Sequence, residues 1–152
     1  MDLARFRGRS THVLDSKGRL SVPARFRDIL KAKYDGKLVV TTTPKCLKAY
    51  PFDEWQKLED RFLSNDLPLP QIEQFQRFFL GGAVECQLDG QGRILIPAPL
   101  RKEVGLNKEI VLQGMLHYFE IWDRKKLSEE LERVKENFDQ YSEMVAKFER
   151  GA

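Results

Sequence analysis

The chain has 152 residues, of which 41% are hydrophobic and 32% are charged, and its formal net charge is +3. This is the composition of an ordinary globular protein, not of a disordered or fibrous one. No apolar run approaches the length of a membrane-spanning helix, and the first residues lack the apolar segment of a signal peptide, so we expect a cytoplasmic protein. The two cysteines, Cys46 and Cys86, form no C-x-x-C motif and do not indicate a disulfide framework.

The positive charge is concentrated near the N-terminus. Residues 1–37 contain ten Lys or Arg and four acidic residues, a net charge of +6, whereas the remainder carries −3. This distribution is typical either of a surface that attracts a polyanion or of unevenly spread solvated charges, and charge alone does not decide between them.

The first half of the chain predicts a strand-rich unit followed by helices. Strands are expected over 10–14 and 19–22, joined as a hairpin by a turn in which Gly18 has a positive φ. Pro23 is expected as the first residue of a helix that runs to residue 30. The remaining expected elements are strands over 37–42 and 46–50 and helices over 53–64 and 71–80, with a proline-containing break at 66–70 between the helices.

The second half repeats this plan. The expected elements are strands over 84–88 and 93–96, a helix over 97–104 ended by Gly105, and strands over 109–113 and 118–122. Because Leu95 stands where the first unit has the polar Ser21, the second hairpin is apolar on both faces, and we expect it to be the more buried of the two.

The C-terminal segment carries a heptad pattern. Its apolar residues are spaced alternately by four and three positions: Leu127, Leu131, Val134, Phe138, Tyr141, Val145 and Phe148. The pattern predicts an amphipathic helix that docks on its own or another chain, or that forms a free coiled coil. Aromatic residues fit coiled-coil seams poorly, which favours docking.

Two blocks of the sequence are nearly the same and lie 74 residues apart, with no gap inside the block. LDSKGRLSVPARFR at 14–27 matches LDGQGRILIPAPLR at 88–101. The repeat predicts two similar units that share a core, because a half-size unit buries little apolar surface alone. It also isolates one Asp-x-x-Gly-Arg turn in each unit, with Asp15 and Arg19 in the first and Asp89 and Arg93 in the second.

These motifs resemble the MraZ family of bacterial transcriptional regulators, whose units belong to the SpoVT/AbrB class of swapped-hairpin DNA-binding domains. The resemblance includes both turns, both Pro-Ala helix starts and the stretches 6–8, 79–82, 86–90 and 119–122. It implies an α+β fold in which two tandem AbrB-like β-hairpin units form a shared, small β-barrel-like core, with linker helices and a C-terminal amphipathic helix. We expect the first unit at 5–52, a helical linker at 53–80, the second unit at 81–124 and the C-terminal helix at 125–150.

The function that this resemblance implies is sequence-specific, DNA-binding transcriptional regulation in the cytoplasm or on the nucleoid. It implies a repressor of the division and cell-wall gene cluster, which includes the regulator's own gene. Family members assemble into ring-shaped homo-oligomers and recognise short G-rich direct repeats. The expected partners are therefore double-stranded DNA and other copies of the chain, with the C-terminal helix and the second unit taking part in self-association. No cofactor, metal or membrane partner is expected.

A two-stranded β-ribbon fits the major groove of DNA, and an arginine fork matches the O6 and N7 atoms of guanine. We therefore predict Arg19 as the base contact, and the resemblance ties this arginine to DNA binding. Lys17, Arg7 and Arg9 are expected on phosphates. Asp15 is expected to support the turn or hold the Arg19 fork. From the residues alone, an ion pair needed only for folding explains Asp15 and Arg19 at least as well.

The second turn has lost charge, because Gln91 stands where the first has Lys17. We therefore hypothesise that the first unit reads DNA and that the second, with Asp89 and Arg93, mainly builds the assembly. A further set of arginines flanks the two short helices, and these either touch phosphate or are solvated or paired with Asp28: Arg25, Arg27 and Arg101.

Two other classes of function were weighed. An enzyme could use Asp15 and Asp89 as a carboxylate dyad, but a nearby arginine favours the ionised form of each, and we predict no enzymatic activity. His12 and His117 lack the spacing of metal ligands. The stronger rival is an antitoxin-like protein of the AbrB class, which binds a protein partner as well as DNA; such a protein is expected to be a dimer and not a larger ring.

Overall fold

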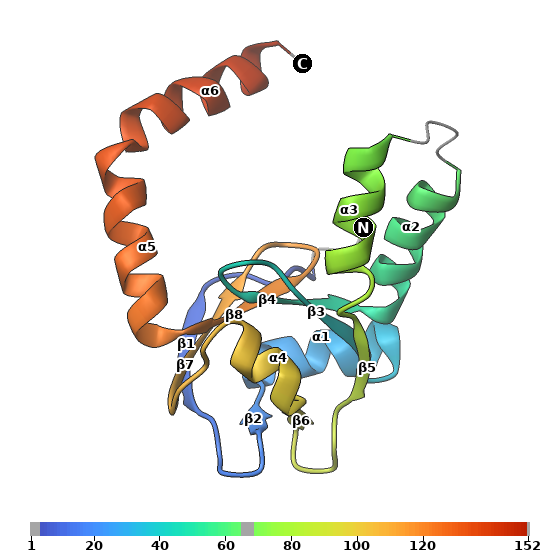
Figure 1. The fold of residues 1–152 in the computed structure, drawn as a ribbon. Helices are drawn as coiled ribbons and strands as arrows, with labels where there is room; N and C mark the ends of the chain where they lie inside the picture. Colours follow the sequence, from blue (N-terminus) through green and yellow to red (C-terminus); the bar gives the residue numbers. More distant parts are fainter. Residues whose placement is uncertain (1–3, 65–68, 152) are drawn as a thin grey trace.

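The computed structural model describes residues 4–64 and 69–151 (Figure 1). The first repeat contains β1 (Arg9–Val13), β2 (Arg19–Ser21), α1 (Ala24–Tyr34), β3 (Lys37–Thr42) and β4 (Leu47–Pro51). The helices α2 (Phe52–Leu63) and α3 (Pro70–Phe79) follow. The second repeat contains β5 (Val84–Gln87), β6 (Arg93–Leu95), α4 (Ala98–Glu103), β7 (Glu109–Gly114) and β8 (Phe119–Asp123). The chain ends in α5 (Arg124–Glu136) and α6 (Phe138–Arg150).

The two repeats exchange strands. In the six-stranded sheet, with order β1-β7-β8-β4-β3-β5, the first strand of each repeat pairs with the third strand of the other, so β1 pairs with β7 and β5 with β3. The second strands, β2 and β6, pair with each other in a separate two-stranded sheet. Neither repeat can therefore complete its sheet alone.

The expectation that strands 10–14 and 19–22 pair as a local hairpin is wrong, and so is its counterpart in the second repeat. The turn itself closes, because Asp15 N donates to Arg19 O at 3.0 Å, but Leu14 N already donates to Lys108 O of the other repeat at 2.8 Å. The alternation of apolar residues fixes which face of a strand is buried but not which strand is its neighbour.

A single main core draws on both repeats, as predicted. Leu20 of β2 and Ile94 of β6 lie opposite each other and are fully buried. In the same core, Phe6, Phe26 and Phe119 form a three-ring cluster with edge-on and tilted contacts. The sheets do not form the closed barrel that a barrel-like core suggested. In the described part of the chain β2 lies beside β1 and β6 beside β5, but no ladder of hydrogen bonds joins the two sheets.

The predicted helix starts and ends are largely confirmed, with two corrections. Pro23 and Pro97 are the N-caps of α1 and α4 and not their first residues. Helix α1 continues four residues past residue 30 because the chain reaches a left-handed Asp35 only there. Gly105 ends α4 with φ +63, and Leu106 N donates back to Arg101 O, which is the expected glycine-ended cap. Most of the predicted break at 66–70 lies outside the described residues; Leu69 caps α3, and Pro70 is the first residue of α3.

The second repeat is not more buried than the first at the paired strands. Leu95 is 56% exposed and Val84 is 37% exposed. Both lie in short strands, β6 and β5, that pair with strands of the first repeat. The outer faces of these strands are exposed to solvent and are not covered by a second layer. The apolar residue that replaces Ser21 therefore adds exposed surface, which corrects the expectation that Leu95 would bury the second hairpin.

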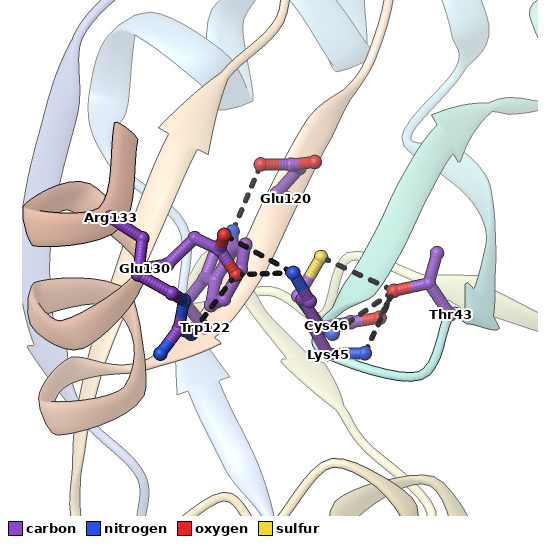
Figure 2. Close-up of polar contacts among 7 residues, drawn as sticks. All are labelled: Thr43, Lys45, Cys46, Glu120, Trp122, Glu130 and Arg133. Carbon is purple, nitrogen blue, oxygen red and sulfur yellow. Dashed lines mark hydrogen bonds and ion pairs between the residues drawn. The ribbon is translucent and has the colours of Figure 1, made fainter. Parts of the chain in front are cut away.

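The C-terminal segment forms two helices that behave differently. α5 docks on its own chain through Leu127 and Leu131, which pack on Trp122, and Lys45 Nζ lies 2.8 Å from Glu130 Oε2 (Figure 2). The helix breaks at Asn137, and α6 extends away from the sheet (Figure 1). Its apolar residues are 45–80% exposed: Phe138, Tyr141, Met144, Val145 and Phe148.

Candidate nucleic-acid interface

The two Asp-x-x-Gly-Arg turns lie next to each other at the end of the molecule opposite α6 (Figure 1). The first turn covers residues 15–19, between β1 and β2, and the second turn covers 89–93, between β5 and β6. Each is tied to the other repeat, because Ile96 N donates to Gly18 O at 2.8 Å and Val22 N donates to Gly92 O at 3.0 Å. The strand exchange thus places two copies of one local motif on one surface.

In the first turn, the carboxylate of Asp15 organises the backbone. Its Oδ1 accepts from Lys17 N at 3.0 Å and from Arg19 N at 2.8 Å, and its Oδ2 accepts from Arg19 Nε at 2.7 Å. An aspartate that binds amides two and four residues onward is a strong turn former. One side chain therefore fixes both the loop and the base of the arginine.

The second turn has the same geometry. Asp89 Oδ1 accepts from Gln91 N at 2.8 Å and from Arg93 N at 2.9 Å, and Oδ2 accepts from Arg93 Nε at 3.0 Å. The equivalent distances in the two turns differ by no more than about 0.3 Å. Gln91 occupies the position that Lys17 has in the first turn, so the two turns differ in charge but not in shape.

Both carboxylates are held in the ionised form. The pKa of Asp15 is lowered, first by the hydrogen bond from Arg19 N and then by the Arg19 side chain and the Lys17 amide. The pKa of Asp89 is lowered mainly by the hydrogen bond from Arg93 N. The two groups are unsuited to act as a proton-sharing acid dyad, since neither is pushed toward the protonated state.

The way each arginine is held decides which of its atoms are presented. Because Nε is bound to the carboxylate, the terminal nitrogens Nη1 and Nη2 remain at the outer end of the guanidinium. Within residues 4–64 and 69–151, neither Arg19 nor Arg93 donates a hydrogen bond from these two nitrogens. About a third of the Arg19 side chain and a quarter of the Arg93 side chain are exposed. A pre-oriented fork of two donors is the group that recognises a pair of acceptors.

Two further arginines lie against these turns. A Cβ atom built on Gly18 would lie 2.9 Å from Cζ of Arg101, and one built on Gly92 would collide with the side chain of Arg27. Sequence reasoning placed both arginines only at the short helices. Their equivalent positions in the two repeats were the available signal, but the contact crosses from one repeat to the other, so the local sequence does not reveal it.

The other predicted site residues lie in different places. Lys17 is exposed at the tip of the first turn. Arg9 begins β1, and its Nε donates to Gln113. At ~3.3 Å per residue, Arg9 lies about 20 Å along the strand from the turn. Arg7 precedes it, and its carbonyl accepts from Arg25 Nε at 3.2 Å. The structure does not bring Arg7 or Arg9 beside the turns.

Neither a metal site nor a membrane span emerges from the described residues. No group of three or more His, Cys, Asp or Glu side chains among them is arranged to hold a metal ion. None of the helices found there is both long and apolar enough to cross a bilayer.

Comparison with known proteins identifies the family. The family model described as "MraZ protein, putative antitoxin-like" matches twice, at residues 5–78 and 79–148. The chain belongs to the MraZ family. It is 40% identical to the transcriptional regulator MraZ of Syntrophobacter fumaroxidans over 93% of this chain and 94% of that protein. Its identity to the MraZ regulator of Desulforapulum autotrophicum is 47%, over 88% and 90% of the two chains.

These matches confirm the resemblance drawn from the repeated motif. The chain is an MraZ-family transcriptional regulator with two tandem MraZ repeats, and this is a family of regulators and not of enzymes. The prediction that the chain is not an enzyme is thereby confirmed.

Proposed function

We propose that this MraZ-family protein is a sequence-specific DNA-binding regulator that presents Arg19 to the edges of bases. The observation that carries the proposal is the fixed Nε of Arg19, which leaves Nη1 and Nη2 as the two terminal donors of a side chain that is 35% exposed. Guanine offers two acceptors, O6 and N7, at the spacing of such a fork. Asp15 acts as the orienting group and does not itself touch DNA.

The projecting surface is built from both repeats. β2 and β6 form a two-stranded antiparallel pair flanked by the two turns, and a two-stranded ribbon has the width of the major groove. Lys17, at the tip of the first turn, is placed to contact phosphate, and phosphate contacts by Arg7 and Arg9 stay a prediction for DNA that extends along β1.

The roles of the two turns are a separate part of the proposal. The first turn carries Lys17 and the second the neutral Gln91, which supports base reading chiefly by Arg19. Arg93 is held by Asp89 in the same way, so its contribution is open to direct test by substitution.

The proposed target and its regulation rest on the resemblance to the family. We propose that the protein acts in the cytoplasm on the nucleoid, and that it represses the division and cell-wall gene cluster, including its own gene, through short G-rich direct repeats. The curated relatives are transcriptional regulators by name, which supports the regulatory part of this proposal.

Self-association complements the reading surface. α6 presents an apolar face to solvent, with Val145 54% and Phe148 80% exposed, while α5 is fixed to its own sheet through Lys45 and Glu130. We propose that α6 joins copies of the chain into a ring. Several identical turn pairs on one ring would raise affinity for repeated sites by about 10²–10⁴, because later contacts become intramolecular.

The second candidate is an antitoxin-like protein, and the same exposed face of α6 is the observation that favours it, since it could equally receive a different protein. The mass of the particle in solution distinguishes the two. A ring is a large homo-oligomer, whereas an antitoxin-like protein is a dimer until its partner is added.

Fluorescence anisotropy with DNA from upstream of the gene, and with a scrambled duplex, tests the function over a series of salt concentrations. Arg19→Ala should reduce the preference for the native duplex by about 10- to 100-fold, the range expected for one arginine–guanine pair, while weak salt-sensitive binding persists. Arg133→Ala, which removes the same charge from α5, is the matched control and should keep the preference. No preference by the wild type at any salt concentration would refute the proposal.

A further inference from the structure

We infer that Arg101 and Arg27 are positioning residues, each holding the DNA-reading turn of the opposite repeat, so that the two turns of one chain act as a single recognition unit. The contacts of the two arginines are features of the structure, whereas their effect on DNA recognition rests on the proposed function.

Arg101 starts in the second repeat and ends against the first turn. A Cβ on Gly18 would lie 2.9 Å from its Cζ and 3.0 Å from its Nε. The guanidinium therefore lies directly against the backbone of Gly18, at a distance that only glycine permits. The φ of Gly18 is +86, so the turn needs glycine for its conformation as well.

Arg27 makes the reciprocal contact. It starts in the first repeat, and a Cβ on Gly92 would collide with its Cδ and Nη1 and lie 3.0 Å from its Nε. Arg27 and Arg101 occupy the same position of the repeated block, 74 residues apart. One contact could be incidental, but the same contact made twice by equivalent residues is a property of the fold.

The contact works by packing and not by hydrogen bonding. Arg101 Nε is buried and is the one buried side-chain nitrogen or oxygen without a hydrogen-bond partner across residues 4–64 and 69–151. A planar guanidinium stacks on flat groups such as peptide planes, which a lysine ammonium cannot do. Leaving a buried donor unpaired is costly, so its retention at this place indicates that the guanidinium is needed there.

The backbone reinforces this coupling. Ile96 N donates to Gly18 O and Val22 N donates to Gly92 O, so each turn is bounded by a strand and by an arginine of the other repeat. Arg19 follows Gly18 directly, and Asp15 binds both the amide and the Nε of Arg19. A more mobile backbone at Gly18 would therefore change the orientation of the Arg19 guanidinium.

Hydrogen–deuterium exchange of the intact protein, read by mass spectrometry, tests the coupling without DNA. Arg101→Ala should speed exchange in the peptide covering 15–21 by about five- to tenfold and leave the peptide covering 89–95 nearly unchanged, and Arg27→Ala should do the reverse. The peptides stop before Val22 and Ile96 because the amides of these two residues bind carbonyls of the opposite turn. Lys102→Ala and Lys31→Ala, exposed neighbours on the same helices, are the matched controls and should change neither peptide.

A second variant separates positioning from folding. Arg101→Met keeps most of the aliphatic stem and removes the unpaired buried donor, so the melting temperature should stay the same or rise. The inference nevertheless predicts faster exchange in the first turn and a preference for native over scrambled DNA reduced by about tenfold. The double variant with Arg19→Ala should lose no more preference than Arg19→Ala alone.

Two results would overturn the inference, and a third would overturn only the proposed function. If each variant loosens the turn of its own repeat, or only its own helix, the arginines are structural. If exchange in the turns is unchanged while the salt dependence of DNA binding falls by about one phosphate contact, they are phosphate ligands. If exchange follows the crossed pattern but no variant binds DNA selectively, including the wild type, the proposed function fails and the coupling stands.

Discussion

Replacing Gly18 by alanine should destabilise the protein more than any other single methyl group added to the turns. The residue has φ +86, and an alanine in the left-handed region costs about 1–2 kcal/mol. The added Cβ would also lie 2.8 Å from Ile96 O, a backbone atom that cannot swing aside. Overpacking of this kind adds about 1–3 kcal/mol, so we expect a total of about 2–5 kcal/mol.

The other two glycines of the turns provide a graded comparison. Gly92 has φ +75, but the group in the way is the side chain of Arg27, which can move, so Gly92→Ala should cost less, about 1–2 kcal/mol. A Cβ on Gly90 meets nothing within 4 Å, and Gly90→Ala should change stability by less than about 0.5 kcal/mol.

Thermal unfolding followed by circular dichroism at one fixed protein concentration measures the series. At about 2–4 °C per kcal/mol for a chain of this size, Gly18→Ala should lower the melting temperature by roughly 4–20 °C, and Gly90→Ala should not lower it detectably. Equal melting temperatures for Gly18→Ala and Gly90→Ala would refute the close contact between the Gly18 backbone and Ile96 of the other repeat.

Three further predictions follow from the turns and the C-terminal helices. Because the pKa values of Asp15 and Asp89 are lowered from 3.8, their stabilisation is complete above that pH and is lost as the pH falls through the lowered values. The protection of the turn amides against exchange should be constant from about pH 7 to 5 and should fall below 3.8, whereas a loss of protection that begins above pH 5 would contradict this. Arg93→Ala should keep the preference for native DNA within about threefold, and loss of binding with the oligomer intact would show that both turns read bases. Leu127→Ala should lower the free energy of unfolding by about 2–4 kcal/mol because it leaves a cavity beneath α5, whereas Phe148→Ala should keep the melting temperature but yield smaller particles in light scattering; an unchanged particle size would exclude α6 from the assembly.

The sequence is informative where contacts are local. The turn residues Asp15 and Arg19 lie four positions apart, so their hydrogen bonds and the positive φ of Gly18 follow from short-range chemistry. The strands were placed to within one or two residues for the same reason, since alternation of apolar residues is visible in a short window.

The pairing of the strands and the crossing arginines depend on distant residues. Leu14 has the same apolar character whether β1 pairs with β2 or with β7, and only the shared core decides for β7. Likewise, nothing near Arg101 in the chain indicates that Gly18 lies against it.

The break in the C-terminal helix shows a different limit. The heptad spacing continues without interruption through Val134 and Phe138, yet α5 ends between them at Asn137, whose Nδ2 donates to Arg133 O at 3.2 Å. A side chain that bonds the backbone of the preceding turn competes with continuation of the helix. The spacing of apolar residues carries no information about this hydrogen bond, so it predicts one continuous helix. The structure instead has one docked helix and one exposed helix.

The central claim is that Arg19 reads guanine through its two outer donors, and replacing guanine by 7-deazaguanine in the target repeats tests it most directly. This base keeps its pairing and loses only the N7 acceptor. Wild-type protein should bind the modified duplex about tenfold more weakly than the natural one, whereas Arg19→Ala should bind the two equally, because the contact is already absent. The same loss in both proteins would contradict the account, since another residue would then be the reader of N7.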